Sequence, residues 1–150
     1  MNGEREEEME MEHSTLINEM KLTLVQAARD VLARAYAPYS KFPVGAALLM
    51  KDGSIITGVN VENASFGVTN CAERTAIFTA VTQGYEKGDI LAVAVAGKTR
   101  NFLPPCSVCR QVMVEFCGPE TPVFLTREDG EILEENIDRL VPYAFVDLNM

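Results

Sequence analysis

The sequence predicts an α/β protein, built as a layered sandwich of helices around a mixed sheet of about five strands. Three observations support this prediction. Two segments, residues 14–37 and 72–82, carry apolar residues at helical spacing. Short apolar runs that lack this spacing alternate with the helical segments along the chain. Two Asp-Gly pairs, Asp52-Gly53 and Asp129-Gly130, are typical of tight turns between antiparallel strands.

The first helix is expected from Ser14 to Ala37. Its apolar face consists of residues that recur at helical spacing, namely Leu16, Met20, Leu24, Ala27, Val31, Leu32 and Ala35. Pro38 is expected to stop this helix, because proline cannot donate the backbone hydrogen bond that a continuing helix requires.

A hairpin and a second helix follow. The predicted strands of the hairpin are Val44–Met50 and Ile55–Val61, with the first Asp-Gly pair between them. The second helix is expected over Ala72–Thr82, where apolar residues again have helical spacing. Gly84 suits the position just past its end, where a left-handed conformation commonly closes a helix.

The second half of the chain predicts three more strands and one helix. Ile90–Ala96 is a continuous apolar run, typical of a central strand. A helix is expected to open at Pro105, because proline suits a first turn whose backbone donors have no partner, and Gly118 follows its end. Strands Val123–Thr126 and Glu131–Leu133 flank the second Asp-Gly pair, so these last two strands are predicted to be antiparallel.

Length and composition indicate a single globular domain. The 150 residues are 47% hydrophobic, which is enough for a substantial core. No run of 18 apolar residues occurs, so no membrane span and no membrane partner are expected. The N-terminus lacks the apolar segment of a signal peptide, so we expect a cytoplasmic protein. Four cysteines in a reducing compartment indicate thiols or metal ligands rather than disulfides.

The net charge of −9 is concentrated at the N-terminus. Residues 1–12 hold six glutamates and one arginine and contribute −5, which leaves −4 for the rest of the chain. We interpret residues 1–13 as an acidic, flexible extension and residues 14–150 as the folded domain. The mild acidity of that domain argues against nucleic acid as a partner, because phosphate binding favours a basic surface.

Three cysteines and one glutamate carry the strongest chemical signal. Cys71-Ala72-Glu73 and Pro105-Cys106-Ser107-Val108-Cys109 together match the zinc-deaminase signature, with Cys71 in place of the usual histidine. The one histidine of the sequence, His13, lies in the acidic stretch, so a buried zinc site would be built from thiolates. Cys71 and Cys106 fall at predicted helix N-termini, which favour thiolate over thiol.

The remaining cysteine, Cys117, decides between a closed and an open zinc site. Eight helical residues separate it from Cys109, which is about 12 Å along the axis, too far for both sulfurs to bind one zinc. Three protein ligands leave the fourth position to water, as in catalytic sites. A structural four-thiolate zinc and a thioredoxin-like Cys-x-x-Cys redox pair are the alternatives, and neither needs Glu73 beside the metal.

Over residues 36–145 the sequence resembles the small homotetrameric cytidine deaminases. The resemblance lies in five segments and a closing element, residues 37–42, 44–47, 60–64, 71–76, 105–111 and 140–145. It implies a three-layer α/β/α cytidine-deaminase-like sandwich. It also implies one Zn²⁺ per chain, bound by Cys71, Cys106 and Cys109, and Glu73 as the catalytic proton shuttle. Zinc lowers the pKa of a bound water to about 7, and one carboxylate can take and deliver the protons of the reaction.

By the same resemblance, further residues surround the metal and the substrate. Arg74 would hydrogen-bond the thiolates, Asn60 and Glu62 would hold the ribose, and Ala72 would contact the substrate. Blasticidin-type deaminases resemble the chain near the metal but lack this Asn-x-Glu pair. Phe42, Phe66 and Phe145 would lie around the base and sugar, Phe66 where relatives often have tyrosine. Phe66 and Phe145 would reach into a neighbouring subunit, which implies a homotetramer with shared active sites.

The function expected from this resemblance is hydrolytic deamination of cytidine and 2′-deoxycytidine to uridine and 2′-deoxyuridine, with release of ammonia, in pyrimidine salvage. Two alternatives stay open. One is a deaminase for another amino-pyrimidine, such as a nucleoside antibiotic. The other is a non-catalytic zinc fold that serves as a binding or scaffold subunit, although a scaffold has no need of Glu73 beside an open metal position.

Overall fold

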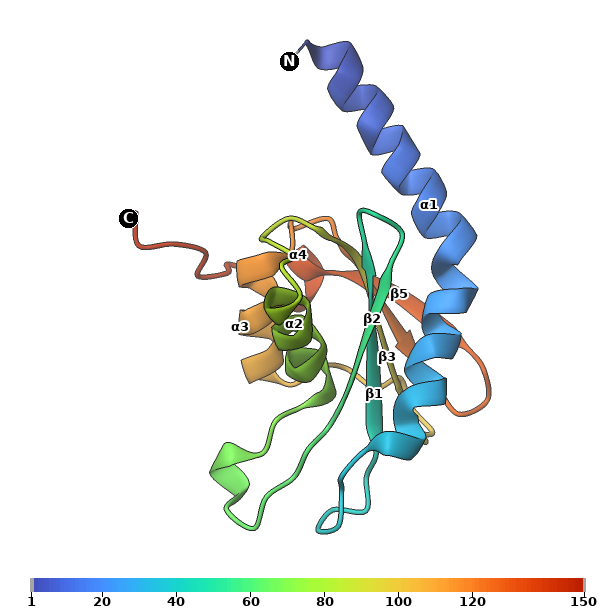
Figure 1. The fold of residues 1–150 in the computed structure, drawn as a ribbon, viewed down its shortest axis with the longest axis vertical. Helices are drawn as coiled ribbons and strands as arrows, with labels where there is room; N and C mark the ends of the chain where they lie inside the picture. The colour runs from blue at the N-terminus through green and yellow to red at the C-terminus, as the bar shows by residue number, and fades with distance from the viewer. Residues whose placement is uncertain (1, 150) are drawn as a thin grey trace.

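Five strands form one mixed sheet in the computed structural model, which describes residues 2–149 (Figure 1). Their order across the sheet is β2-β1-β3-β4-β5. The bounds are β1 Val44–Met50, β2 Ile55–Val59, β3 Ile90–Gly97, β4 Pro122–Thr126 and β5 Ile132–Asn136. The β3–β4 pair is parallel and the other three pairs are antiparallel. These pairings confirm the mixed sheet, the central place of β3 and the antiparallel final pair.

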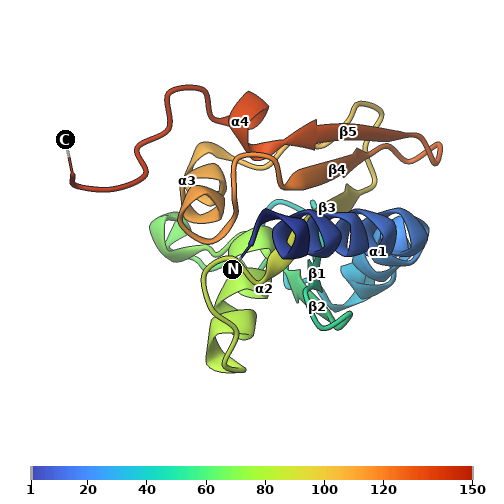
Figure 2. The ribbon, with the colours of Figure 1, turned by 90° about the horizontal axis from the view of Figure 1, so that it is seen from above.

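Helices cover both faces of the sheet, so the molecule has three layers (Figure 2). The long helix α1 (Gly3–Asp30) lies on one face against β1 and β3, and α2 (Ala72–Thr82) packs on the other face against β1 and β2. The helix α3 (Ser107–Phe116) lies beside α2. Three short helical segments complete the fold: η1 (Val31–Arg34), η2 (Phe66–Val68) and α4 (Ile137–Leu140). The predicted three-layer sandwich is therefore confirmed.

The alternating residues of the central strands build two separate hydrophobic cores. Leu48, Val93 and Val95 face α2 and α3, where they join the larger core with Ile77 and Met113. Their neighbours in sequence face α1, in a smaller core that includes Ala47, Leu49, Ala92, Ala94 and Phe124. The alternation follows from the two-residue period of a strand, which sends successive side chains to opposite faces.

The first helix differs from its predicted bounds at both ends. It begins at Gly3, so residues 3–13, which the sequence suggested were a flexible extension, are helical, and residues 3–12 are exposed. Glutamate has a good helix propensity and stabilises the first turn through the helix dipole, which explains this result. The helix ends at Asp30 instead of continuing to Ala37. The chain continues as η1 to Arg34 and then leaves the helical conformation, because the Tyr36 backbone pairs with the segment around Val61, with Tyr36 N–H donating to the Asn60 carbonyl at 3.0 Å.

Smaller corrections concern the C-terminal half and the hairpin. Strand β5 runs to Asn136 rather than ending at Leu133, and α4 follows it without having been predicted. The strand continues through Glu134 and Glu135, because an edge strand tolerates charged residues. Strand β2 ends at Val59, and the helix α3 begins at Ser107 with Cys106 as its N-cap rather than at Pro105.

Among the described residues, no helix combines the length and the apolar character needed to cross a membrane.

Gly58 sets the distance between β2 and α2. A Cβ atom at this position would lie 2.3 Å from the Ala76 nitrogen and 2.6 Å from the Ala72 carbonyl oxygen, both backbone atoms that cannot turn aside. We expect Gly58→Ala to lower the free energy of unfolding by about 3 kcal/mol, the upper range for overpacking a core. Urea denaturation measures this change. Gly118→Ala is the control, because its nearest atom would be 3.8 Å away, and equal stability of the two variants would contradict the expectation.

Candidate metal centre and active site

The N-termini of α2 and α3 meet at one point of the molecule. Cys71 is the N-cap of α2 and Cys106 is the N-cap of α3, both with extended backbone, and Cys109 lies in the first turn of α3. Both helix ends present free N–H groups and the positive end of the helix dipole. The Cys106 sulfur accepts a hydrogen bond from the Cys109 N–H at 3.4 Å. The predicted placement of these cysteines at helix N-termini is thus confirmed.

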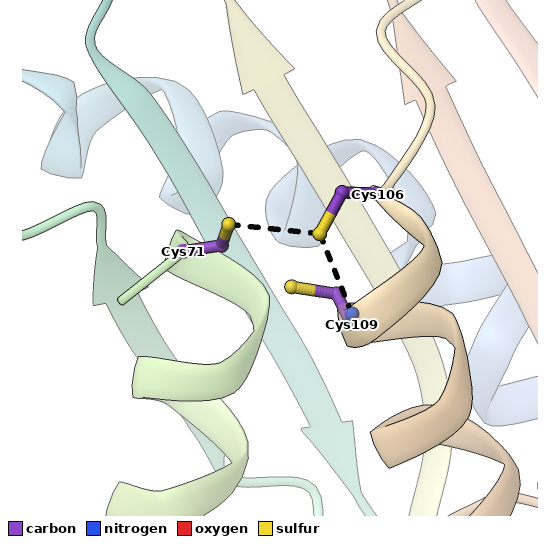
Figure 3. A group of neighbouring side chains, drawn as sticks. All are labelled: Cys71, Cys106 and Cys109. Atoms are coloured by element: carbon purple, nitrogen blue, oxygen red, sulfur yellow. Dashed lines mark hydrogen bonds between the residues drawn. The ribbon is translucent and has the colours of Figure 1, made fainter. Parts of the chain in front are cut away.

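The three sulfur atoms form a compact cluster. The side chains of Cys71, Cys106 and Cys109 point toward one another from the two helices (Figure 3). All three sulfurs lie within 4.8 Å of one another, and the Cys71–Cys106 separation is 3.7 Å. A tetrahedral zinc with Zn–S bonds of about 2.3 Å places its sulfurs about 3.8 Å apart. The cluster therefore fits a zinc ion with three thiolate ligands.

Arg74 compensates the charge of this cluster. Its Nε donates to the Cys109 sulfur at 3.4 Å, and its Nη2 donates to the Cys71 sulfur at 3.3 Å. Hydrogen bonds from the Cys109 thiol and from Arg74 lower the pKa of Cys71 to about 5. Such donors make a three-thiolate site less electron-rich, so a metal held there would be a stronger Lewis acid than three unpartnered thiolates would allow.

Glu73 is a buried carboxyl group beside the cysteines. Only 3% of the residue is exposed. Burial raises the pKa of Glu73 to about 7, and the negative charge of Cys71 acts in the same direction. A carboxyl group with a pKa near neutrality can both take up and release a proton at the pH of the cell.

Cys117 stands apart from the cluster. It lies at the C-terminal end of α3, among the apolar side chains of the larger core, and burial raises its pKa to about 12. Within residues 2–149, the group of potential ligands around Cys71 contains Cys106 and Cys109 but not Cys117. The helix keeps Cys117 at the opposite end of α3 from the other sulfurs, as its spacing in the sequence predicted.

Asn60 and Glu62, predicted to hold a sugar, hold the loop between η1 and β1. The Asn60 amide accepts from the Val44 N–H and donates to the Phe42 carbonyl, both at 2.8 Å. Glu62 accepts from the backbone N–H groups of Tyr39 and Ser40, each at 3.0 Å. Both side chains are buried, with 8% exposed. The structure thus joins Asn60, Glu62 and Phe42 into one hydrogen-bonded unit.

The other predicted substrate contacts differ in their exposure. Phe42, Phe66 and Phe145 are all exposed rather than buried in a core, and the Phe66 ring lies edge-on to Tyr39 at 6.1 Å. Ala72 is buried in the first turn of α2, next to Cys71 and Glu73. The chain end that follows α4 leads away from the body of the molecule in both views (Figures 1 and 2).

Three polar residues near this site escaped the sequence reasoning. Arg110 donates from Nε to the Pro105 carbonyl at 2.8 Å and from Nη1 to the Leu140 carbonyl at 2.9 Å, so it ties the segment before Cys106 to α4. Gln111 donates to the Phe145 carbonyl at 2.9 Å and fastens the C-terminal segment to α3. The third residue is Ser40, which contacts Glu62. The signal that could have identified these three residues is their position inside segments 37–42 and 105–111, which carry the family resemblance.

Comparisons with known proteins agree with this geometry. A family model described as the cytidine and deoxycytidylate deaminase zinc-binding region matches residues 18–126. The cytidine deaminase of Halalkalibacterium halodurans is 50% identical over 127 residues, which cover 85% of this chain and 95% of that protein. The cytidine deaminase of Sporosarcina psychrophila is 48% identical and is covered to 88%, against 81% of this chain. The crystal structure of the Burkholderia pseudomallei cytidine deaminase superposes with a TM-score of 0.80 at 48% identity, covering 82% of this chain and 97% of that one.

Proposed function

This chain belongs to the cytidine and deoxycytidylate deaminase family, and we propose that it hydrolyses cytidine and 2′-deoxycytidine to uridine and 2′-deoxyuridine with release of ammonia. Its relatives identify it as a cytidine deaminase. Activity on 2′-deoxycytidine and a role in pyrimidine salvage are part of the proposal. The observation that carries the proposal is the meeting of three sulfurs and the buried Glu73 at two helix N-termini.

The metal of this site is zinc, one ion per chain, and Cys71, Cys106 and Cys109 would hold it. Their soft thiolate donors and the 3.7 Å sulfur separation suit zinc. When bound, the ion lowers the pKa of a water molecule to about 7 and so supplies a nucleophile at neutral pH. Arg74 would keep the thiolates from neutralising the ion, since it already donates to two of them.

Glu73 is the residue proposed to move protons. Its carboxylate takes one proton from the attacking water and delivers it to N3 of the cytosine ring. It then takes the second proton from the new hydroxyl at C4 and delivers it to the departing amine, as the C4–N bond breaks and the C4 carbonyl forms. The net reaction consumes one water and releases one ammonia. A pKa near 7 suits this alternation, because neither the charged nor the neutral carboxyl is strongly favoured at neutral pH.

The substrate contacts are proposed from the same arrangement. Asn60 and Glu62 would bind sugar hydroxyls. Phe42 would lie against the same nucleoside, since the Asn60 amide holds the Phe42 carbonyl and so keeps this residue next to the sugar site. The side chain of Ala72 is buried, so the backbone of this residue, between Cys71 and Glu73, would contact the base.

Phe66 and Phe145 are proposed to complete the active site of a neighbouring subunit in a homotetramer. Phe66 is 73% exposed and Phe145 is 52% exposed, so both rings are available for such contacts. We also propose a cytoplasmic location, with small nucleosides and sister subunits as partners rather than nucleic acids or membranes.

A substrate panel tests the chemical class of the substrate. We expect turnover of cytidine and deoxycytidine but none of cytidine monophosphate or a single-stranded oligonucleotide, because the domain carries net negative charge and no basic stripe. Loss of ultraviolet absorbance of the cytosine ring, with ammonia release, measures each reaction. Efficient deamination of the oligonucleotide would contradict the proposal, and preference for a nucleoside antibiotic would support the other amino-pyrimidine alternative. A zinc-loaded protein inactive on every substrate would indicate a scaffold.

A further inference from the structure

The loop from Tyr36 to Val44 is fastened along its length to the segment Asn60–Glu62. At one end, Glu62 N–H donates to the Tyr36 carbonyl at 2.8 Å, and at the other end Asn60 N–H donates to the Val44 carbonyl at 3.3 Å. In the middle, Lys41 has a φ of +57°, a left-handed conformation that is uncommon for a residue with a side chain. A loop with such a residue keeps its shape only when the surrounding bonds determine it.

The Ser40 hydroxyl lies at the centre of these bonds. It donates to Oε2 of Glu62 and accepts from the Phe42 N–H at 3.0 Å. One side chain therefore connects the buried carboxylate with the backbone of the aromatic residue. The Ser40 hydrogen bond is also the largest cause that holds the pKa of Glu62 below its usual value, so the carboxylate is ionised at neutral pH.

The bonds of Glu62 leave little room for a ligand. An ionised carboxylate has about four acceptor positions. The Tyr39 and Ser40 N–H groups occupy two at Oε1, and the Ser40 hydroxyl occupies one at Oε2. About one position is left, on the oxygen whose orientation Ser40 sets. A ligand hydroxyl that donates to Glu62 must meet this single position.

We propose that Ser40 is a positioning residue for substrate recognition, because it holds Glu62 with one acceptor position open to a sugar hydroxyl. This inference rests on the proposed function, in which Glu62 faces the ribose. Ser40 touches no reacting atom and acts through Glu62 and Phe42. It thereby sets the preference for a nucleoside with a 2′- or 3′-hydroxyl over one that lacks both.

The test compares two substrates in the zinc-loaded enzyme and in Ser40→Ala. We expect the variant to raise KM for cytidine about tenfold, the loss expected for a misaligned hydrogen bond to a charged group, with a smaller change in kcat. 2′,3′-Dideoxycytidine keeps the 5′-hydroxyl but has neither the 2′- nor the 3′-hydroxyl that would donate to Glu62. Its KM (or its Ki, if it is not turned over) should stay within about twofold. Ser40→Thr, which restores a hydroxyl, should recover most of the preference.

Ser14→Ala is the matched control. It makes the same chemical change at an exposed position of α1, outside the loop that holds Glu62, so wild-type kinetics are expected. An equal loss on both nucleosides in Ser40→Ala would show a merely structural role and overturn the inference, as would unchanged KM for cytidine. If the wild-type enzyme itself does not deaminate cytidine, the proposed function fails instead, so the two failures are distinguishable.

Discussion

Glu73→Gln is expected to lose nearly all deaminase activity while the protein keeps its fold and its zinc. Glutamine has nearly the same shape as glutamate, but an amide cannot take the proton from water and return it to the ring and the amine. General acid–base catalysis contributes about 10²–10⁴-fold, and Glu73 is proposed to serve several proton transfers, so a loss near the upper value is expected. Initial rates with cytidine measure this loss, and metal analysis measures the zinc content.

An exposed glutamate provides the control for this variant. Glu86→Gln makes the same chemical change on the surface, outside the metal centre, and should have wild-type rates. Because Glu73 is buried, circular dichroism and the zinc content check that the variant keeps its fold. A zinc-replete Glu73→Gln enzyme with wild-type rates would end its assignment as the proton shuttle.

The fold was largely predictable because its sheet has a strong local signal. The runs Val44–Met50 and Ile90–Gly97 are almost wholly apolar, which indicates strands covered on both faces. The glycines of both Asp-Gly turns have positive φ, +85° at Gly53 and +94° at Gly130, as tight turns require. The end of the first helical segment, at Arg34, was not predictable, because it depends on the pairing of Tyr36 with a segment far along the chain.

The metal cluster was predictable for a different reason. Cys106 and Cys109 lie in one helical turn, so their sulfurs approach each other wherever that helix forms. The polar support of the site was not predictable, since it depends on distances between segments. Asn60 and Glu62 alternate along the chain, but the sequence does not show that most of their hydrogen bonds go to the loop around Ser40. Likewise, Arg110 reaches Leu140 only because α4 forms.

A pair of serine substitutions separates the proposed zinc ligands from the fourth cysteine. Cys109→Ser should lose most of its zinc and its activity, because serine is a far weaker zinc ligand than thiolate and the cluster would keep only two sulfurs. Metal analysis of the purified variant measures the zinc per chain, and the cytidine assay measures the activity. The variant should remain folded if its stability comes mainly from the two cores on either side of the sheet.

Cys117→Ser makes the same change at the other end of α3 and should keep about one zinc per chain with near-normal turnover. Burial raises the pKa of Cys117 to about 12, so this residue is a neutral thiol among apolar side chains rather than a metal ligand. A hydroxyl placed there without a partner costs about 1 kcal/mol of unfolding free energy, measurable by urea denaturation. If folded Cys117→Ser instead lost its zinc, the metal would have four cysteine ligands and no open position. A closed site of that kind leaves no coordination position for water, so the catalytic proposal would fail together with the three-ligand assignment.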